Sequence, residues 1–187
     1  VALQGAAAPI ALCAARTLYG ATWGENDRIV FGQAHTGIFE VLTNGGEPKL
    51  LVAPQLDREE IAFEGPRLLP GGRSVMFSVL KAGRNWNRAT IVAQNLMTGE
   101  RRVLHEGGSD ARYLPSGHLL FVRDRSLYAM PFDLGAMTVS GSPVPVVSDV
   151  WRSLMFETGA GQLDVSQNGT LVHVTAAQSP NSTTLVW

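Results

Sequence analysis

One turn motif, followed by a run of apolar residues, recurs four times along this chain. Its copies are GENDRIVF, LPGGRSVMF, LPSGHLLF and SQNGTLVH, and they are anchored at Asp27, Gly72, Gly117 and Gly169. The anchors lie 45, 45 and 52 residues apart. A period near 45 residues is typical of propeller blades and of helical solenoids. Gly or Pro interrupts the sequence about every ten residues, which excludes the long helices of a solenoid.

Residues 64–104 contain one whole copy of the repeat. We predict four short strands there, because short apolar or β-branched runs alternate with turn residues. Such a sheet has two apolar faces and needs a similar sheet on each side. The sequence therefore predicts an all-β fold, a β-propeller of four-stranded antiparallel blades. The four predicted strands cover residues 66–69, 74–80, 90–96 and 101–104.

We expect residues 1–187 to form a single propeller segment of about four blades. The blades are expected near residues 18–60, 61–109, 110–160 and 161–187, with a strand at 9–14 completing the last one. In two other interpretations the chain is part of a longer propeller, or a half-ring that pairs with a second copy into eight blades. Chain ends that fall inside a blade favour the longer propeller.

Composition limits the partners. The formal charge of −1 gives no electrostatic reason to expect nucleic acid or an anionic membrane. Cys13 is the one cysteine, which excludes a disulfide within the chain. The apolar opening, residues 1–20, is interrupted by Pro9 and Arg16. We therefore expect no membrane insertion by this segment.

The repeats resemble those of a known family, the TolB-like, WD-repeat-like bacterial propellers. LPGGRSVMF, LPSGHLLF and SQNGTLVH resemble its Ser-Pro-Asp-Gly turn and the strand that follows, and NLMTGERRVL resembles its hairpin between strands three and four. The run GGSDARYLPSGHLLFVRDRSLYAMPFDL is closer still to propellers attached behind bacterial serine/threonine kinases. This resemblance covers residues 10–187 and implies a sensing or docking role and an extracytoplasmic location. A fold of this kind specifies function poorly.

Catalytic motifs of the related enzymes are missing from the sequence. It has no glycine-rich nucleotide loop, His-Arg-Asp or Asp-Phe-Gly motif of a kinase, and no Gly-x-Ser-x-Gly elbow of a hydrolase. We predict that this chain is not an enzyme.

Polar residues occupy the position five residues before each anchor. They are Thr22, Arg67, Arg112 and Asp164. First strands line the central channel of a propeller, so Arg67, Arg112 and Asp164 are candidate residues for binding a partner at the channel mouth. In the alternative interpretation the arginines only pair with nearby acids such as Glu64 and Asp110.

Trp86 is a further candidate for partner binding. It lies in the polar loop 81–88 between Arg84 and Arg88, and an aromatic residue among arginines is a frequent binding anchor. The same residue could instead cap a neighbouring blade.

No cofactor or metal site is predicted. The histidines occupy unrelated positions, and His173 aligns with the core positions Phe31, Met76 and Phe121. We expect a non-catalytic module that binds or senses a protein or peptide within a larger bacterial signalling protein. The alternatives are the substrate-gating propeller of a prolyl-oligopeptidase-like serine peptidase and a self-assembling scaffold without a ligand.

Overall fold

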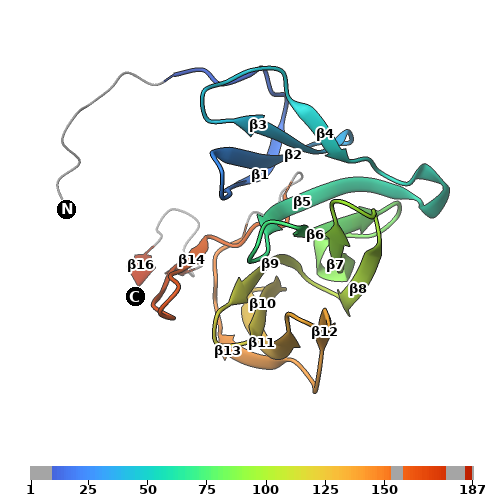
Figure 1. Cartoon of the computed structure of the whole chain (residues 1–187). Helices are drawn as coiled ribbons and strands as arrows, with labels where there is room; N and C mark the ends of the chain where they lie inside the picture. Colours follow the sequence, from blue (N-terminus) through green and yellow to red (C-terminus); the bar gives the residue numbers. More distant parts are fainter. Residues whose placement is uncertain (1–9, 153–157, 176–183, 187) are drawn as a thin grey trace, which may run out of the picture.

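The strands of this protein surround a common centre. The computed structural model describes residues 10–152, 158–175 and 184–186, and these residues form four antiparallel sheets. In Figure 1 the sheets follow one another around the centre, each with its first strand innermost. The all-β propeller fold predicted from the repeat is confirmed. No helix in the described residues is long and apolar enough to cross a membrane.

The first sheet is built from consecutive hairpins. Its turns use residues that accept a positive φ, such as His35 and Gly45, and Gly45 donates a backbone hydrogen bond to the Leu42 carbonyl. Its strands are β1 (Leu18–Trp23), β2 (Arg28–Gln33), β3 (Gly37–Leu42) and β4 (Lys49–Val52).

The second sheet has a longer inner strand than expected. Its first strand begins at Glu60 rather than at residue 66, because Phe63 pairs with Val79 before a bulge between Glu64 and Arg67. Gly and Pro are rare inside strands, so the Gly-Pro pair at 65–66 indicated a strand start at residue 66 and not a strand that continues through it. The strands are β5 (Glu60–Leu68), β6 (Ser74–Lys81), β7 (Thr90–Asn95) and β8 (Arg101–Glu106), and short 3-10 turns η1 (Leu56–Arg58) and η2 (Trp86–Arg88) flank β5 and β7.

The third sheet contains one strand more than predicted. A two-residue strand pairs Val139 with Phe132 at the end of β11, whereas Val147 pairs with Leu127 at its start. Two short strands therefore share the outer edge of β11. The strands are β9 (Ser109–Leu114), β10 (His118–Arg123), β11 (Ser126–Asp133), β12 (Thr138–Val139) and β13 (Val144–Val147).

The fourth sheet contains β14 (Leu163–Val165), β15 (Leu171–Thr175) and β16 (Thr184–Val186). Residues 176–183 and 187 of the blade predicted near 161–187 lie outside the described residues, as does residue 9 of the strand predicted at 9–14.

Residues 10–15 form no strand, which contradicts the expected strand at 9–14. The Leu12 carbonyl instead accepts a hydrogen bond of 3.0 Å from the Gly46 amide, in the turn between β3 and β4 of the first sheet. In the described residues the fourth sheet consists of β14, β15 and β16, and residues 10–15 are not paired with it. The division of the chain into blades stays a prediction.

Three apolar clusters lie between neighbouring sheets. Val30 and Phe63 belong to the cluster of the first and second sheets, and Met76 and Phe121 to that of the second and third. Val122 and Leu163 belong to the smaller cluster of the third and fourth sheets. Both middle sheets thus bury two faces, as blades of a propeller do. Within the described residues, none of these clusters joins the fourth sheet to the first.

Candidate functional site

A cavity of about 390 Å³ lies where the inner strands of the four sheets end. Each sheet contributes the end of β1, β5, β9 or β14 and part of the turn that follows. The inner strands all end at this cavity, so residues at equivalent positions of the repeat line it together. The cavity is lined by residues from the ranges 22–25, 67–72, 112–115 and 164–167.

Three of the four predicted site residues line this cavity. They are Arg67, Arg112 and Asp164, and Thr22 lies beside them. Their common spacing from the turn motif placed them correctly relative to one another. Whether they bind a partner is a separate question, which depends on the bonds that they already make.

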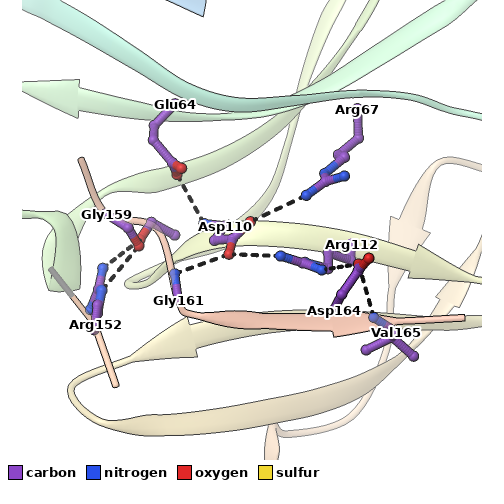
Figure 2. A network of polar contacts seen from close by, with 10 residues as sticks. Glu64, Arg67, Asp110, Arg112, Arg152, Gly159, Gly161, Asp164 and Val165 are labelled. Carbon is purple, nitrogen blue, oxygen red and sulfur yellow. Dashed lines mark hydrogen bonds and ion pairs between the residues drawn. The ribbon is translucent and has the colours of Figure 1, made fainter. Parts of the chain in front are cut away.

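The carboxylate of Asp110 is the centre of the polar network beneath the cavity (Figure 2). Its Oδ2 lies 3.2 Å from Nη2 of Arg112 and accepts a hydrogen bond of 3.0 Å from the Gly161 amide. Its Oδ1 lies 3.9 Å from Nη2 of Arg67. One buried carboxylate therefore connects the second sheet, the third sheet and the segment that leads into the fourth.

Arg112 is held from two sides. Besides Asp110, it donates a hydrogen bond of 2.6 Å to Oδ1 of Asp164, whose side chain is 77% exposed. Two carboxylates thus neutralise one guanidinium. Arg112 therefore pairs with a nearby acid, Asp110, as the alternative interpretation of the sequence expected.

Arg67 is bonded less completely. No acceptor in the described part of the chain takes a hydrogen bond from its guanidinium, and its Nε is sealed from solvent without a partner. The side chain is 33% exposed and lies at the cavity wall. Burial and the nearby Arg112 lower the pKa of Arg67 below its ordinary value.

Glu64 lies below the cavity and is only 1% exposed. Its Oε2 accepts a hydrogen bond of 3.3 Å from the Asp110 amide, which the positive φ of 51° at Asp110 turns away from the strand ladder. Burial first, and then the charge of Asp110, raise the pKa of Glu64 from 4.5 to about 8. Glu64 is therefore mainly protonated at neutral pH.

Aromatic and apolar side chains form the rest of the wall. Trp23 is 71% exposed, and Tyr113 and Leu68 lie at the equivalent positions of the next two sheets. The sequence contained the signal for Trp23, because it occupies the position after Thr22 in the same alignment. A large exposed aromatic residue at a cavity is a common feature of binding sites.

Trp86, the fourth predicted site residue, is not part of this cavity. Its ring packs edge-on against Tyr19, with centroids 6.2 Å apart, and a methyl group at Gly159 would lie 2.8 Å from its Cγ. The residue is half-buried between neighbouring elements. These contacts agree with the interpretation that Trp86 caps the neighbouring sheet.

Arg152 lies near Trp86 and was missed by the sequence analysis. It is 5% exposed and donates a hydrogen bond of 3.0 Å to the Gly159 carbonyl (Figure 2). It also bonds to Ser109 and Asn87. It lies between β13 and β14, outside the repeat, so no spacing pointed to it.

Metal-ligating side chains do not gather in the part of the chain that the structure describes: no group there has three or more such residues. His105 packs against Phe121, with ring centroids 4.6 Å apart. Burial and then Arg123 lower its pKa.

Comparisons with solved structures agree with the fold. TolB from Acinetobacter baumannii is 18% identical, with a TM-score of 0.56, over 90% of this chain and 40% of that chain. A luciferin-regenerating enzyme is 8% identical, with a TM-score of 0.62, over 87% of this chain and 57% of that one. The calcium-binding protein regucalcin from Agrobacterium tumefaciens is 14% identical, with a TM-score of 0.55, over 84% and 52%.

These similarities extend to the fold alone, because every identity is low. The chain spans roughly half of the length of these proteins, from 40% to 57%. No family model matches the sequence, and neither does any curated protein. The TolB-like propeller fold is thus supported, whereas the resemblance to kinase-attached propellers stays a prediction. These similar proteins include an enzyme and a calcium-binding protein, so the comparison does not choose between catalysis and binding.

Proposed function

We propose that this chain is a non-catalytic binding module of a larger bacterial protein and that the central cavity is its binding site. The observation that carries the proposal is the cavity itself, to which all four sheets contribute charged, polar or aromatic residues. Concave sites with a few convergent polar groups and apolar walls are typical of ligand binding. The ligand is a small molecule or the end of a peptide, because the volume is about 390 Å³.

The burial of Glu64 favours binding over catalysis. Its pKa of about 8 would suit a general base, but the side chain is 1% exposed and is not among the residues that line the cavity. Asp110, the next acid, already faces Arg112 and the Gly161 amide. The acidic groups of this network therefore serve to hold the sheets together and to position the arginines.

The same network favours a binding site over a passage. A gating propeller needs a centre through which a substrate can move. Here the buried Asp110, beneath the cavity, contacts Arg67 of the second sheet, Arg112 of its own sheet and the Gly161 amide of the segment that leads into the fourth sheet. A cavity with such a floor suits a ligand that enters and leaves by the same opening.

Nuclear magnetic resonance with a fragment library of acids, bases and neutral compounds tests this proposal. We expect at least one fragment to shift the amide signals of residues near Thr22, Arg67, Tyr113 and Val165. Trp23→Ala should weaken that fragment at least tenfold without unfolding the protein, because Trp23 is 71% exposed.

Trp151→Ala is the matched control, since Trp151 is also exposed and does not line the cavity. It should leave binding unchanged. A library in which no fragment shifts the cavity signals, or binding that Trp23→Ala does not weaken, would contradict the proposed site.

A further inference from the structure

We propose that the ligand of the cavity carries one carboxylate, which Arg67 binds, next to an aromatic or apolar group that packs against Trp23 and Tyr113. This inference rests on the proposed function and adds the chemical class of the ligand to it.

The arginines of the network differ in how many of their donors are used. Arg112 bonds to Asp110 and Asp164, and Arg152 bonds to Ser109, Asn87 and the Gly159 carbonyl. Among the described residues, the guanidinium of Arg67 has only its contact of 3.9 Å with Asp110, which is longer than a hydrogen bond. Of these three guanidinium groups, that of Arg67 is the one with donors available at the cavity.

A carboxylate matches these donors in shape and charge. A guanidinium presents parallel N–H groups that fit the two oxygens of a carboxylate. The exposed carboxylate of Asp164 lines the same cavity, and it would repel a doubly charged phosphate more strongly than a singly charged acid. The site therefore suits a monoanion.

The remaining wall indicates the body of the ligand. Trp23, Tyr113 and Leu68 present apolar surface beside Arg67, and the volume of about 390 Å³ is at the small end of the range for ligand pockets. An aromatic carboxylic acid or the carboxyl-terminal residue of a peptide meets these conditions. Both sources share the same chemistry at Arg67.

The proton on Glu64 supports this choice and gives it a pH signature. Glu64 faces the charges of Asp110, Arg152 and Arg67. While Glu64 is protonated, it does not compete for the positive charge of Arg67. A bound anion at Arg67 and an ionised Glu64 repel each other. The affinity for the anion should therefore fall as the pH rises above about 8, by at most about tenfold per pH unit.

Isothermal titration with phenylacetate and its neutral analogue phenylacetamide tests the inference. We expect phenylacetate to bind at least tenfold more tightly at pH 7. Arg67→Gln should remove this preference, and Arg67→Lys, which keeps the charge without the fork, should retain part of it. Arg84→Gln, at an exposed arginine outside the cavity, is the matched control and should change nothing.

Two further measurements sharpen the test. N-acetyl-Gly-Phe as the free acid and as the amide shows whether a peptide terminus is also accepted. Glu64→Gln should leave acid binding intact and remove its decline above pH 8. Circular dichroism of every variant establishes that the fold is kept.

The possible failures can be told apart. If fragments bind in the cavity but phenylacetamide binds as tightly as phenylacetate, or if Arg67→Gln keeps the preference for acid, the carboxylate inference is wrong and the binding site stands. If no compound of any charge binds in the cavity, the proposed function itself is overturned.

Discussion

Glu64 is an acid whose environment favours the neutral form, and this has a measurable cost. Below pH 4.5 the carboxyl group is protonated in both the folded and the unfolded protein, so it does not affect stability. Between pH 4.5 and about 8 only the unfolded state ionises, and the free energy of unfolding falls by at most about 1.4 kcal/mol per pH unit. Above about pH 8 this penalty is complete.

Glu64→Gln should therefore stabilise the protein at pH 8 relative to the natural residue and have little effect at pH 4.5. Urea unfolding at the two pH values measures this difference. Glu60→Gln is the contrasting control, because Glu60 is buried and its Oε1 lies 2.6 Å from Nη1 of Arg101. That variant should destabilise the protein by about 3 kcal/mol at pH 8. Equal effects of the two variants would contradict the role given to Glu64.

Only those cavity residues that occupy equivalent positions of the repeat could be predicted from the sequence. Arg67, Arg112 and Asp164 share one position in the repeat, so an alignment of the repeats placed them together. Arg152 lies outside the repeat, and the depth at which Glu64 is buried depends on the bulge in β5 and on the left-handed Asp110. Such backbone irregularities have no periodic signal, so spacing alone could not find them.

At the scale of the elements, the turn between β5 and β6 is set by Gly72, whose φ is 63°. Its amide donates a hydrogen bond of 2.9 Å to the Leu69 carbonyl, which closes the turn. A β-branched residue is strained in this left-handed conformation. Gly72→Val should therefore lower the free energy of unfolding by more than about 1 kcal/mol.

Thermal unfolding of Gly72→Val and Gly72→Asn measures this effect. Asparagine tolerates the left-handed region, so Gly72→Asn should lie closer to the natural protein. A valine variant as stable as the asparagine variant would mean that the turn does not need a positive φ at this position.

The strands predicted at 74–80 and 90–96 agree with β6 and β7 to within one residue at each end. Both are runs of apolar and β-branched residues bounded by turn residues, so local pattern was enough to find them. The expectation failed where a longer-range contact decides the structure, as for residues 10–15, where the Leu12 carbonyl bonds to Gly46. It also failed for β12, because a strand of two residues is too short to produce a pattern.

At the scale of the whole molecule, the cores are unequal. β6 has six buried residues and packs between two clusters, whereas every residue of β15 is only half-buried. In repeat folds, stability depends on the contacts between neighbouring units. We therefore expect the amides of β6 and β10 to exchange at least tenfold more slowly than those of β15.

Hydrogen exchange followed by mass spectrometry measures these rates in the intact chain. The two-sided packing of the middle sheets is the reason for the expected gradient. Equal protection of β6 and β15 would show instead that the molecule opens as one cooperative unit.

The sequential pairing of the strands has a consequence for how the protein is made. Apart from the pairing of β11 with β13, strand pairs in the described part of the chain join neighbours in the sequence, so a sheet can form as soon as its own residues have left the ribosome. Asp110 emerges after Glu64 and Arg67 but before Gly161. Its buried carboxylate can therefore meet its earlier partners first, and it gains the last one only when synthesis has reached the final sheet.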